Sequence, residues 1–287
     1  MVLPLESLVA DELAQPVDPQ VLAMAEAIAA RHGAASRAVL FYGSCLREKQ
    51  LDGLMLDFYL IVSDYRAAYE KGWMARANAL IPPNVFPFQH GRLAAKYAVL
   101  SEADFQRLNG PETRNVSVWA RFAQPSRLVW ASDESARGRA VAAVSRAAPT
   151  LLAAAGRVAG EAPLDWWRRA FSLTYSAELR AERKGRSGSV VDADAARYEL
   201  FSGPAEAAIE PGAKSGGWGR RRIEGKALSV ARLAKASATY AGGADYIVWK
   251  INRHAGTAFE LKPWQRRHPL LGALSLLPRL LKSGAIR

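Results

Sequence analysis

The sequence has one cysteine, Cys45, and no apolar run as long as a membrane-spanning helix. One cysteine cannot form a disulfide within the chain, and low cysteine content suits a reducing compartment. A helix that crosses a bilayer needs about 20 predominantly apolar residues, so we expect no transmembrane segment. The first residues include Glu6, Asp11 and Glu12 and lack the basic-then-apolar order of a secretory signal. We therefore expect a cytoplasmic protein.

Acidic residues are scarce in the last quarter of the chain. The net charge is +12 over 287 residues, and residues 213–287 hold 15 Lys or Arg against three acids. Residues 1–212 hold 24 bases and 24 acids, so the whole excess follows residue 212. Such an excess favours an anionic partner, either a membrane surface or a nucleic acid. The chain carries no nucleic-acid-binding motif, which makes nucleic acid the less favoured partner.

An apolar run from Ala38 to Tyr42 predicts a short buried strand. The run ends at Gly43 and Ser44, where glycine lets backbone N–H groups approach a ligand closely. Such a turn can hold phosphate groups through backbone and hydroxyl donors. The alternative is that the two residues only cap a helix, because a lone Gly-Ser pair is a weak signal.

A second strand is predicted from Leu54 to Val62, and it carries one carboxylate, Asp57. Side chains alternate between the two faces of a strand, so Asp57 shares its face with Met55, Tyr59 and Ile61. An unpartnered carboxylate in apolar surroundings costs free energy. We therefore expect a cation or hydrogen-bond donors beside Asp57.

The two segments resemble the mitochondrial-type phosphatidate cytidylyltransferases, the translocator assembly and maintenance family. That family carries Tyr-Gly-Ser-Gly and then Met-(Leu/Ile)-Asp-Phe, and this chain has Tyr42-Gly43-Ser44 and Met55-Leu56-Asp57-Phe58. Cys45 replaces the family's second glycine. Met55 stands where the wider nucleotidyltransferase superfamily has the first acid of Asp-x-Asp. The resemblance implies a Mg2+-dependent enzyme that forms CDP-diacylglycerol and pyrophosphate from CTP and phosphatidate on a membrane surface.

Two later blocks extend the resemblance. The family's Lys-Tyr-Gly-Val-(Val/Ile)-Ser segment is matched at Lys96, and its Gly-Arg-x-x-Lys-Pro block is matched at Arg121 and Pro125. Ala120 and Gln124 depart from the second block. Arginine suits bidentate phosphate binding, so Arg121 is a candidate phosphate contact. Lys96 is another candidate, and the alternative for it is an ordinary solvated strand lysine.

The last block supplies a second acid. The family has Ser-Tyr-x-Gly-Asp-(Leu/Ile)-Arg where this chain has Thr174 to Arg180, so that Glu178 stands for the aspartate. Glu178 also falls on the apolar face of a predicted helix, an unusual place for an exposed glutamate. The alternative is a glutamate that is paired with a neighbouring arginine.

The resemblance assigns a role to each of these residues. It implies nucleotide binding by Gly43, Ser44, Lys96 and Arg121. It implies Mg2+ ligation by Asp57 and Glu178, and it makes Asp57, Glu178 and Arg121 the catalytic residues. Phosphoryl-type transfer depends on positioning and charge neutralisation rather than covalent chemistry.

The sequence as a whole predicts an α/β (α+β) protein with a nucleotidyltransferase-like mixed sheet and a mainly helical C-terminal domain. We expect a catalytic domain in residues 1–130, a helical domain in residues 131–212 that completes the site, and a basic helical tail in residues 213–287. Helices are expected at Pro19–Arg31, Tyr65–Leu80, Ser132–Pro149, Glu161–Arg183 and Ile223–Tyr240, a third strand at Gly91–Leu100, and a linker at Pro204–Trp218.

The final segment, Leu270–Lys282, predicts a helix with a leucine stripe, flanked by bases and preceded by Trp264. It is too short to span a bilayer and suits an interfacial anchor, although it could instead dock on the protein's own core. We therefore expect peripheral association with the inner face of the cytoplasmic membrane. Two other functions remain open: transfer to RNA or a soluble phosphate acceptor, and a non-catalytic membrane-associated protein on a decayed core, which Cys45 and Met55 would favour.

Overall fold

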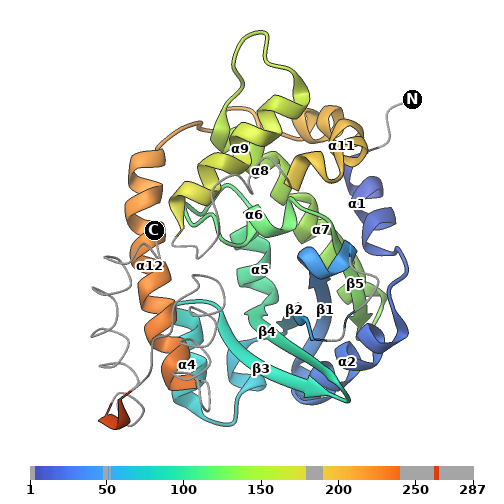
Figure 1. Cartoon of the computed structure of the whole chain (residues 1–287), viewed down its shortest axis with the longest axis vertical. Coiled ribbons are helices and arrows are strands. Elements are labelled where there is room, and N and C mark those ends of the chain that lie inside the picture. Colours follow the sequence, from blue (N-terminus) through green and yellow to red (C-terminus); the bar gives the residue numbers. More distant parts are fainter. Residues whose placement is uncertain (1–3, 48–50, 52, 179–189, 240–261, 265–287) are drawn as a thin grey trace.

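A five-stranded mixed β-sheet lies at the centre of the protein (Figure 1). The computed structural model describes residues 4–47, 51, 53–178, 190–239 and 262–264. The strands are β1 (Ser36–Tyr42), β2 (Met55–Val62), β3 (Asn84–His90), β4 (Leu93–Ser101) and β5 (Ser126–Ala131). Their order in the sheet is β3-β4-β2-β1-β5. β2 and β4 run parallel, and the other neighbours are antiparallel.

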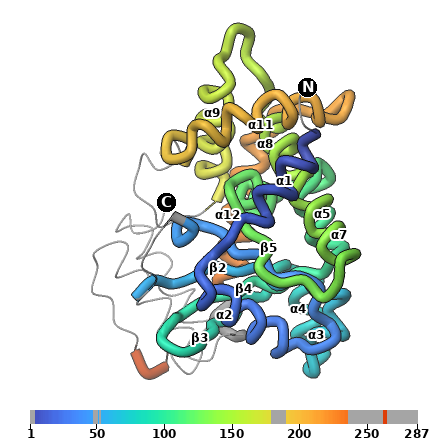
Figure 2. Tube along the Cα trace, turned by 90° about the vertical axis from the view of Figure 1, so that its right-hand side faces the viewer, coloured from blue at the N-terminus to red at the C-terminus, as the bar shows by residue number. Residues whose placement is uncertain are grey.

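Helices pack on both faces of this sheet. Up to β5 the described residues form α1 (Leu5–Leu13), α2 (Pro19–Ala30), α3 (Tyr65–Ala68), α4 (Gly72–Leu80), α5 (Glu102–Asn109) and α6 (Trp119–Phe122). After β5 they form α7 (Glu134–Ser145), α8 (Ala147–Ala155), α9 (Pro163–Ala177), α11 (Ala195–Ala207) and α12 (Trp218–Thr239). Two views place α8, α9 and α11 at one end of the molecule and α2 and α4 at the other (Figure 1, Figure 2).

Two hydrophobic clusters divide the sheet by face, as the alternation of side chains requires. On one face Val39 and Leu60 pack with Met24 and Ile28 of α2. On the other face Leu40, Tyr59 and Ile61 join a cluster that extends into α5 to α9 and α11. The expected α/β class and the mainly helical second half are therefore confirmed. The proposed domain boundaries stay predictions, and one cluster contains side chains from both sides of residue 130.

The three predicted strands are present as β1, β2 and β4, but β3 and β5 were not predicted. β3 forms an antiparallel hairpin with β4 and lies at the edge of the sheet. Pro87 stands within it, and proline argues against a strand because it lacks a backbone N–H. An edge strand tolerates proline because one side of its backbone has no neighbouring strand to bond. The edge position, which allows Pro87, is a property of the sheet order and is not visible in the local sequence.

Two helices end or break at other residues than predicted. The helix expected from Glu161 to Arg183 ends at Ala177, because Glu178 has an extended backbone with φ −113° and ψ 155°. Glu178 therefore does not lie on a helix face. The helical stretch expected to break near Pro149 breaks at Arg146 instead, and Pro149 lies inside α8.

Two further predictions about helical segments need correction. The helix expected over Tyr65–Leu80 is broken into α3 and α4, because Tyr69 has an extended backbone with φ −130° and ψ 127°. The linker expected from Pro204 is wrong at its start, since α11 continues through Pro204 to Ala207. Phe201 and Ala205 of α11 are buried in the core. Tertiary packing there outweighs the low helix propensity of proline.

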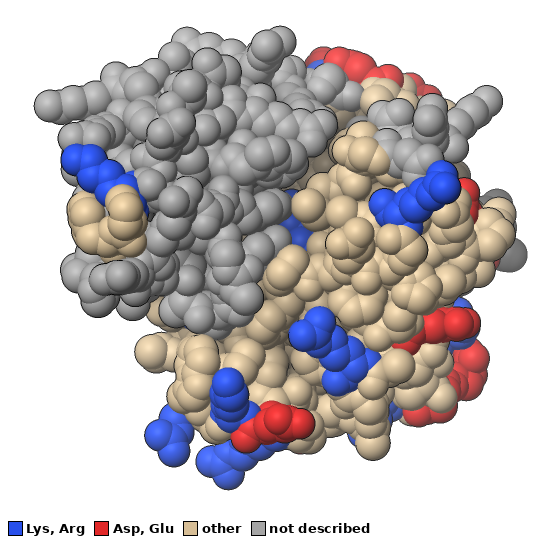
Figure 3. Space-filling view, turned by 60° about the horizontal axis from the view of Figure 1, so that its bottom comes forward, with Lys and Arg blue, Asp and Glu red and all other residues tan. Residues whose placement is uncertain are grey.

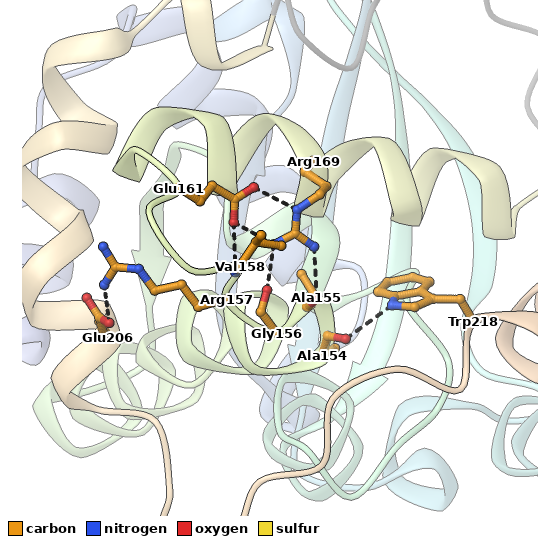
Figure 4. Close-up of polar contacts among 9 residues, drawn as sticks. All are labelled: Ala154, Ala155, Gly156, Arg157, Val158, Glu161, Arg169, Glu206 and Trp218. Atoms are coloured by element: carbon orange, nitrogen blue, oxygen red, sulfur yellow. Dashed lines mark hydrogen bonds and ion pairs between the residues drawn. The ribbon is translucent and has the colours of Figure 1, made fainter.

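The start of α12 is held on the end of α8 (Figure 4). The last carbonyl groups of a helix lack partners within the helix. Here the Ala154 carbonyl accepts from the backbone N–H of Gly216 at 2.9 Å and from Trp218 Nε1 at 3.1 Å. Arg169 donates to the carbonyls of Ala155 and Gly156 at 3.0 and 2.6 Å. α12 therefore begins at a fixed point on the helical part of the molecule.

No helix in the described part of the chain is long and apolar enough to cross a membrane. The predicted anchor at Leu270–Lys282 lies outside the described residues. On the face drawn in Figure 3, the blue Lys and Arg side chains are spaced over the described surface and do not gather into one patch. The expected anchor stays a prediction from sequence.

Candidate active site

The turn after β1 lies directly beside Asp57. Gly43 has a φ of +95°, a conformation that L-residues with a side chain rarely adopt. Asp57 is the register partner of Tyr42 across β1 and β2. A Cβ atom built on Gly43 would lie 3.5 Å from Asp57 Oδ2. Ser44 follows, exposed, at the start of the short 3₁₀ helix Ser44–Arg47. The predicted turn and the predicted carboxylate are thus neighbours in space.

Asp57 has the cation that its apolar strand predicts. The parallel register of β2 and β4 places Lys96 opposite Asp57, and Lys96 Nζ lies 2.9 Å from Asp57 Oδ1. The two side chains are 25% and 24% exposed. Both groups can therefore be reached from solvent, as groups that meet a ligand must be.

Arg121 and Glu178 form a second ion pair. Glu178 directly follows α9, and its side chain is 7% exposed. Its Oε1 lies 3.6 Å from Arg121 Nη1, and Arg121 also donates to the backbone carbonyl of Ser117. Burial lowers the pKa of Arg121, but the negative charge of Glu178, with Tyr59, Tyr42 and Asp57, raises that pKa far above the ordinary value. The guanidinium stays charged, and Glu178 is its main counter-charge.

Two tyrosines connect the ion pairs. The rings of Tyr42 and Tyr59 lie 5.3 Å apart, centroid to centroid. Burial raises the pKa of Tyr42, and the charge of Asp57 raises it further. Burial also raises the pKa of Tyr59, while Arg121 and a further arginine, Arg232, lower it. Both Glu178 and Asp57 act on Tyr59 as well. Both ion pairs therefore lie near the same two phenols, which burial keeps neutral, and we treat them as one site.

Arg232 is the residue of this site that sequence reasoning missed. It lies on α12, and it donates to the Pro82 carbonyl at 2.9 Å and to Ser117 Oγ at 2.8 Å. Gly225, Ser229 and Arg232 follow the i, i+4, i+7 spacing of one helix face. Gly225 is buried, so this face packs on the protein. A base on the buried face of a basic helix was the available signal.

Asp57 and Glu178 suit a metal ion that is already bound to phosphate. Within the residues that the structure describes, no group of three or more His, Cys, Asp or Glu could hold a metal ion. Mg2+ at phosphate-transfer sites commonly takes one or two carboxylates and completes its shell with phosphates and water. Asp57 and Glu178 could supply that donor set. Each is paired with a cation here, so together they do not form a cage for an ion alone.

Two cavities in the described part of the chain lie away from these charges. One of 230 Å³ is lined by Phe41, Cys45 and the segment from Pro16 to Val21 at the start of α2, and one of 360 Å³ lies between α5 and α7. Neither is lined by Asp57, Lys96, Arg121 or Glu178. The candidate site is therefore a convergence of charged side chains at the ends of β1 and α9.

No protein-family model matches the chain, and no curated protein matches its sequence. What the fold defines is a mixed α/β protein, a five-stranded sheet with helices and a helical C-terminal part.

Proposed function

We propose that the protein is a Mg2+-dependent nucleotidyltransferase that forms CDP-diacylglycerol and pyrophosphate from CTP and phosphatidate. The observation that carries this proposal is the convergence of the Gly43 turn, the Asp57–Lys96 pair and the Arg121–Glu178 pair. A strand, a Gly-Ser turn and a carboxylate on the adjacent strand are the parts of a nucleotidyltransferase core. The choice of CTP and phosphatidate comes from the resemblance to the mitochondrial-type phosphatidate cytidylyltransferases.

In the proposed reaction a phosphate oxygen of phosphatidate attacks the α-phosphorus of CTP in line. The bond between the α-phosphorus and the bridging oxygen breaks, and pyrophosphate leaves with that bond's electron pair. A phosphomonoester dianion is already nucleophilic, so the reaction needs no general base. The protein has to position the two phosphates and neutralise their charge.

Each residue of the site has a part in that task. Backbone N–H groups at Gly43 and the Ser44 hydroxyl donate to the terminal phosphates of the nucleotide. Lys96 and Arg121 neutralise phosphate charge, and the planar guanidinium can bind two oxygens at once. Asp57 and Glu178 would hold Mg2+, which supplies further neutralisation of the reacting phosphates. Tyr42 and Tyr59 line the site as neutral phenols.

Membrane association is part of the same proposal. The lipid substrate lies in a bilayer, and the positive charge of residues 213–287 would hold the protein at the anionic inner face of the cytoplasmic membrane. Both the domain arrangement and this location remain proposals.

A non-catalytic protein on a decayed core is the second candidate. Cys45 and Met55 replace residues of the family pattern. Each remaining carboxylate is already neutralised by a basic side chain. Such a protein could bind a nucleotide or a membrane without transferring anything.

The test is incubation of the full-length protein with each labelled nucleoside triphosphate, Mg2+ and phosphatidate in mixed micelles. We expect a nucleotide-lipid product with CTP, and parallel reactions with RNA or soluble phosphate esters test the other acceptors. A folded protein that binds Mg2+–CTP and yields no product with any acceptor would be the decayed form.

The Asp57→Ala variant tests the site itself. We expect it to remain folded and to lose transfer, because it removes the carboxylate beside the turn and breaks the ion pair with Lys96. Circular dichroism and thermal unfolding check the fold. Near-normal turnover in the folded variant would reject this site.

A further inference from the structure

Two arginines of the site are held by the same residue. Arg121, on α6, donates to the backbone carbonyl of Ser117. Arg232, on α12, donates through Nη1 to Ser117 Oγ at 2.8 Å. Two guanidinium groups that bond one residue lie close to each other, although they are far apart in the sequence.

We propose that Arg232 is a phosphate-binding residue of this site and forms, with Arg121, a two-arginine clamp for a phosphate group. The phosphate belongs either to the nucleotide or to the lipid headgroup, an assignment that rests on the proposed function. The clamp itself requires only that a phosphate-bearing ligand enter the site.

The charges around Arg232 support this role. Its hydrogen-bond acceptors, the Pro82 carbonyl and Ser117 Oγ, are neutral. Within the described residues it makes no ion pair, and Glu178, whose charge acts on it, already pairs with Arg121. Burial lowers the pKa of Arg232, and the neighbouring Arg121 lowers it further. In the described part of the chain, the two arginines share a single ion-paired carboxylate, Glu178, and two such like charges favour an additional anion.

The position of Arg232 is fixed by the docking of α12. In Figure 1 the helix runs from beside α9 toward α4, and it contacts α9 and β3. Near α9, Gly225 packs against the Ala177 carbonyl so closely that a Cβ atom would lie 2.2 Å from the oxygen. Two turns further on, Arg232 reaches Ser117, and Lys235 donates to the carbonyls of Ile81 and Pro83. A guanidinium held in this way is oriented before the ligand arrives, which lowers the entropic cost of binding.

The test compares three full-length proteins: wild type, Arg232→Gln and Lys226→Gln. Glutamine removes the charge, and its amide can still donate to the Pro82 carbonyl, which accepts from Arg232 Nε. Lys226 is an exposed base on the same helix, so its variant controls for the loss of one positive charge. Calorimetric titrations use Mg2+–CTP, pyrophosphate and a soluble short-chain phosphatidate.

We expect Arg232→Gln to weaken the binding of the phosphate ligand by about 10- to 100-fold. The Lys226→Gln substitution should change the same affinity less than about threefold. A loss confined to Mg2+–CTP and pyrophosphate assigns the clamp to nucleotide phosphates, and a loss confined to phosphatidate assigns it to the headgroup. Wild-type affinity for all three ligands in folded Arg232→Gln overturns the proposal.

A second measurement uses the wild-type protein and so does not depend on the folding of a variant. Phenylglyoxal modifies arginines, and peptide mass spectrometry follows each site. We expect saturating pyrophosphate or phosphatidate to slow modification of Arg121 and Arg232 and to leave exposed Arg222 unchanged. Equal rates at Arg232 with and without every ligand overturn the clamp.

These results separate the clamp from the proposed reaction. If no nucleotide-lipid product forms and pyrophosphate still binds through Arg232, the result supports the two-arginine clamp and rejects the proposed cytidylyltransferase reaction. If the product forms and Arg232→Gln binds every ligand normally, the reaction stands and the clamp does not.

Discussion

Glu178 and Asp57 show at the scale of single residues how differently two carboxylates can be held. Asp57 is about a quarter exposed and pairs with Lys96 on the neighbouring strand. Glu178 is buried after the end of α9 and pairs with an arginine on another helix. Removal of one member of a buried pair leaves an uncompensated charge, which is costly, whereas exposed pairs contribute little. The two acids should therefore respond differently to neutral substitution.

We predict that Glu178→Gln weakens the Mg2+ dependence of transfer and lowers the free energy of unfolding by about 1–3 kcal/mol, because Arg121 loses its main counter-charge. Metal titration of activity and urea unfolding measure the two effects. Glu206→Gln is the control, since Glu206 pairs with Arg157 at the surface and should cost less than about 1 kcal/mol. A metal titration equal to that of wild type would make Glu178 a structural residue only.

At the scale of elements, α12 joins the helical part of the molecule to the edge of the sheet. It begins at Trp218 on the end of α8, passes Ala177 at Gly225, and reaches the segment before β3 through Arg232 and Lys235. The basic tail expected as a membrane-association region thus begins with a helix that packs on the protein. We base two predictions on the contacts of α12.

We predict that Gly225→Ala destabilises the protein by about 1–3 kcal/mol, because its Cβ would meet the Ala177 carbonyl and backbone cannot move cheaply. Since Glu178 follows Ala177, transfer should fall as well. Gly219→Ala is the matched control on the same helix, with nothing within 4 Å of the added Cβ. It should be neutral or stabilise by up to about 1 kcal/mol. Equal stability of both variants in thermal unfolding would contradict the close approach.

We predict that the free energy of unfolding depends on pH through the titration of Lys235. Burial, with the charge of Arg232, lowers its pKa from 10.5 to about 7 in the folded protein. Between these values the unfolded chain holds a proton that the folded chain lacks. Stability therefore rises with pH across this range, by at most about 1.4 kcal/mol per pH unit, and the gain is lost as pH falls to 7.

The measurement is urea unfolding of wild type and Lys235→Gln at several pH values from 7 to 10. We expect the difference in free energy of unfolding, wild type minus variant, to grow with pH. A difference that stays constant over this range would show that Lys235 keeps its proton when the protein folds.

For the whole molecule, the distribution of charge is the main feature. The excess of +12 lies entirely after residue 212. Among the described residues of this region, Arg232 and Lys235 face the protein and bond its carbonyl and hydroxyl groups. Part of the basic tail is thus used within the fold.

We predict that removal of Leu270–Arg287 releases the protein from anionic vesicles and leaves nucleotide binding intact. Each base near an anionic surface contributes about 1 kcal/mol, and a leucine stripe adds about 25 cal/mol per Å² of buried apolar area. The proposed binding groups all precede residue 240. Co-sedimentation with acidic and neutral vesicles at low and high salt measures the effect. Unchanged sedimentation, or loss of nucleotide binding, would show that this segment docks on the protein.

The sequence alone determined the class of fold, the strands β1, β2 and β4, the face on which Asp57 lies, and the need for a cation beside it. These features follow from local periodicity and from the cost of an unpaired carboxylate, both of which are written in neighbouring residues. The candidate site residues could also be proposed at this stage, because short segments carry the resemblance.

Only the tertiary structure decided which groups meet. Lys96 became the partner of Asp57 through the parallel register of β2 and β4. Glu178 became the partner of Arg121 because α6 and α9 both pack on α8. Arg232 reaches the site because α12 packs against Ala177. The same holds for β3, whose proline is acceptable only at a sheet edge. Contacts of this kind are set by which elements pack together across the whole chain, and no short window of sequence contains that information.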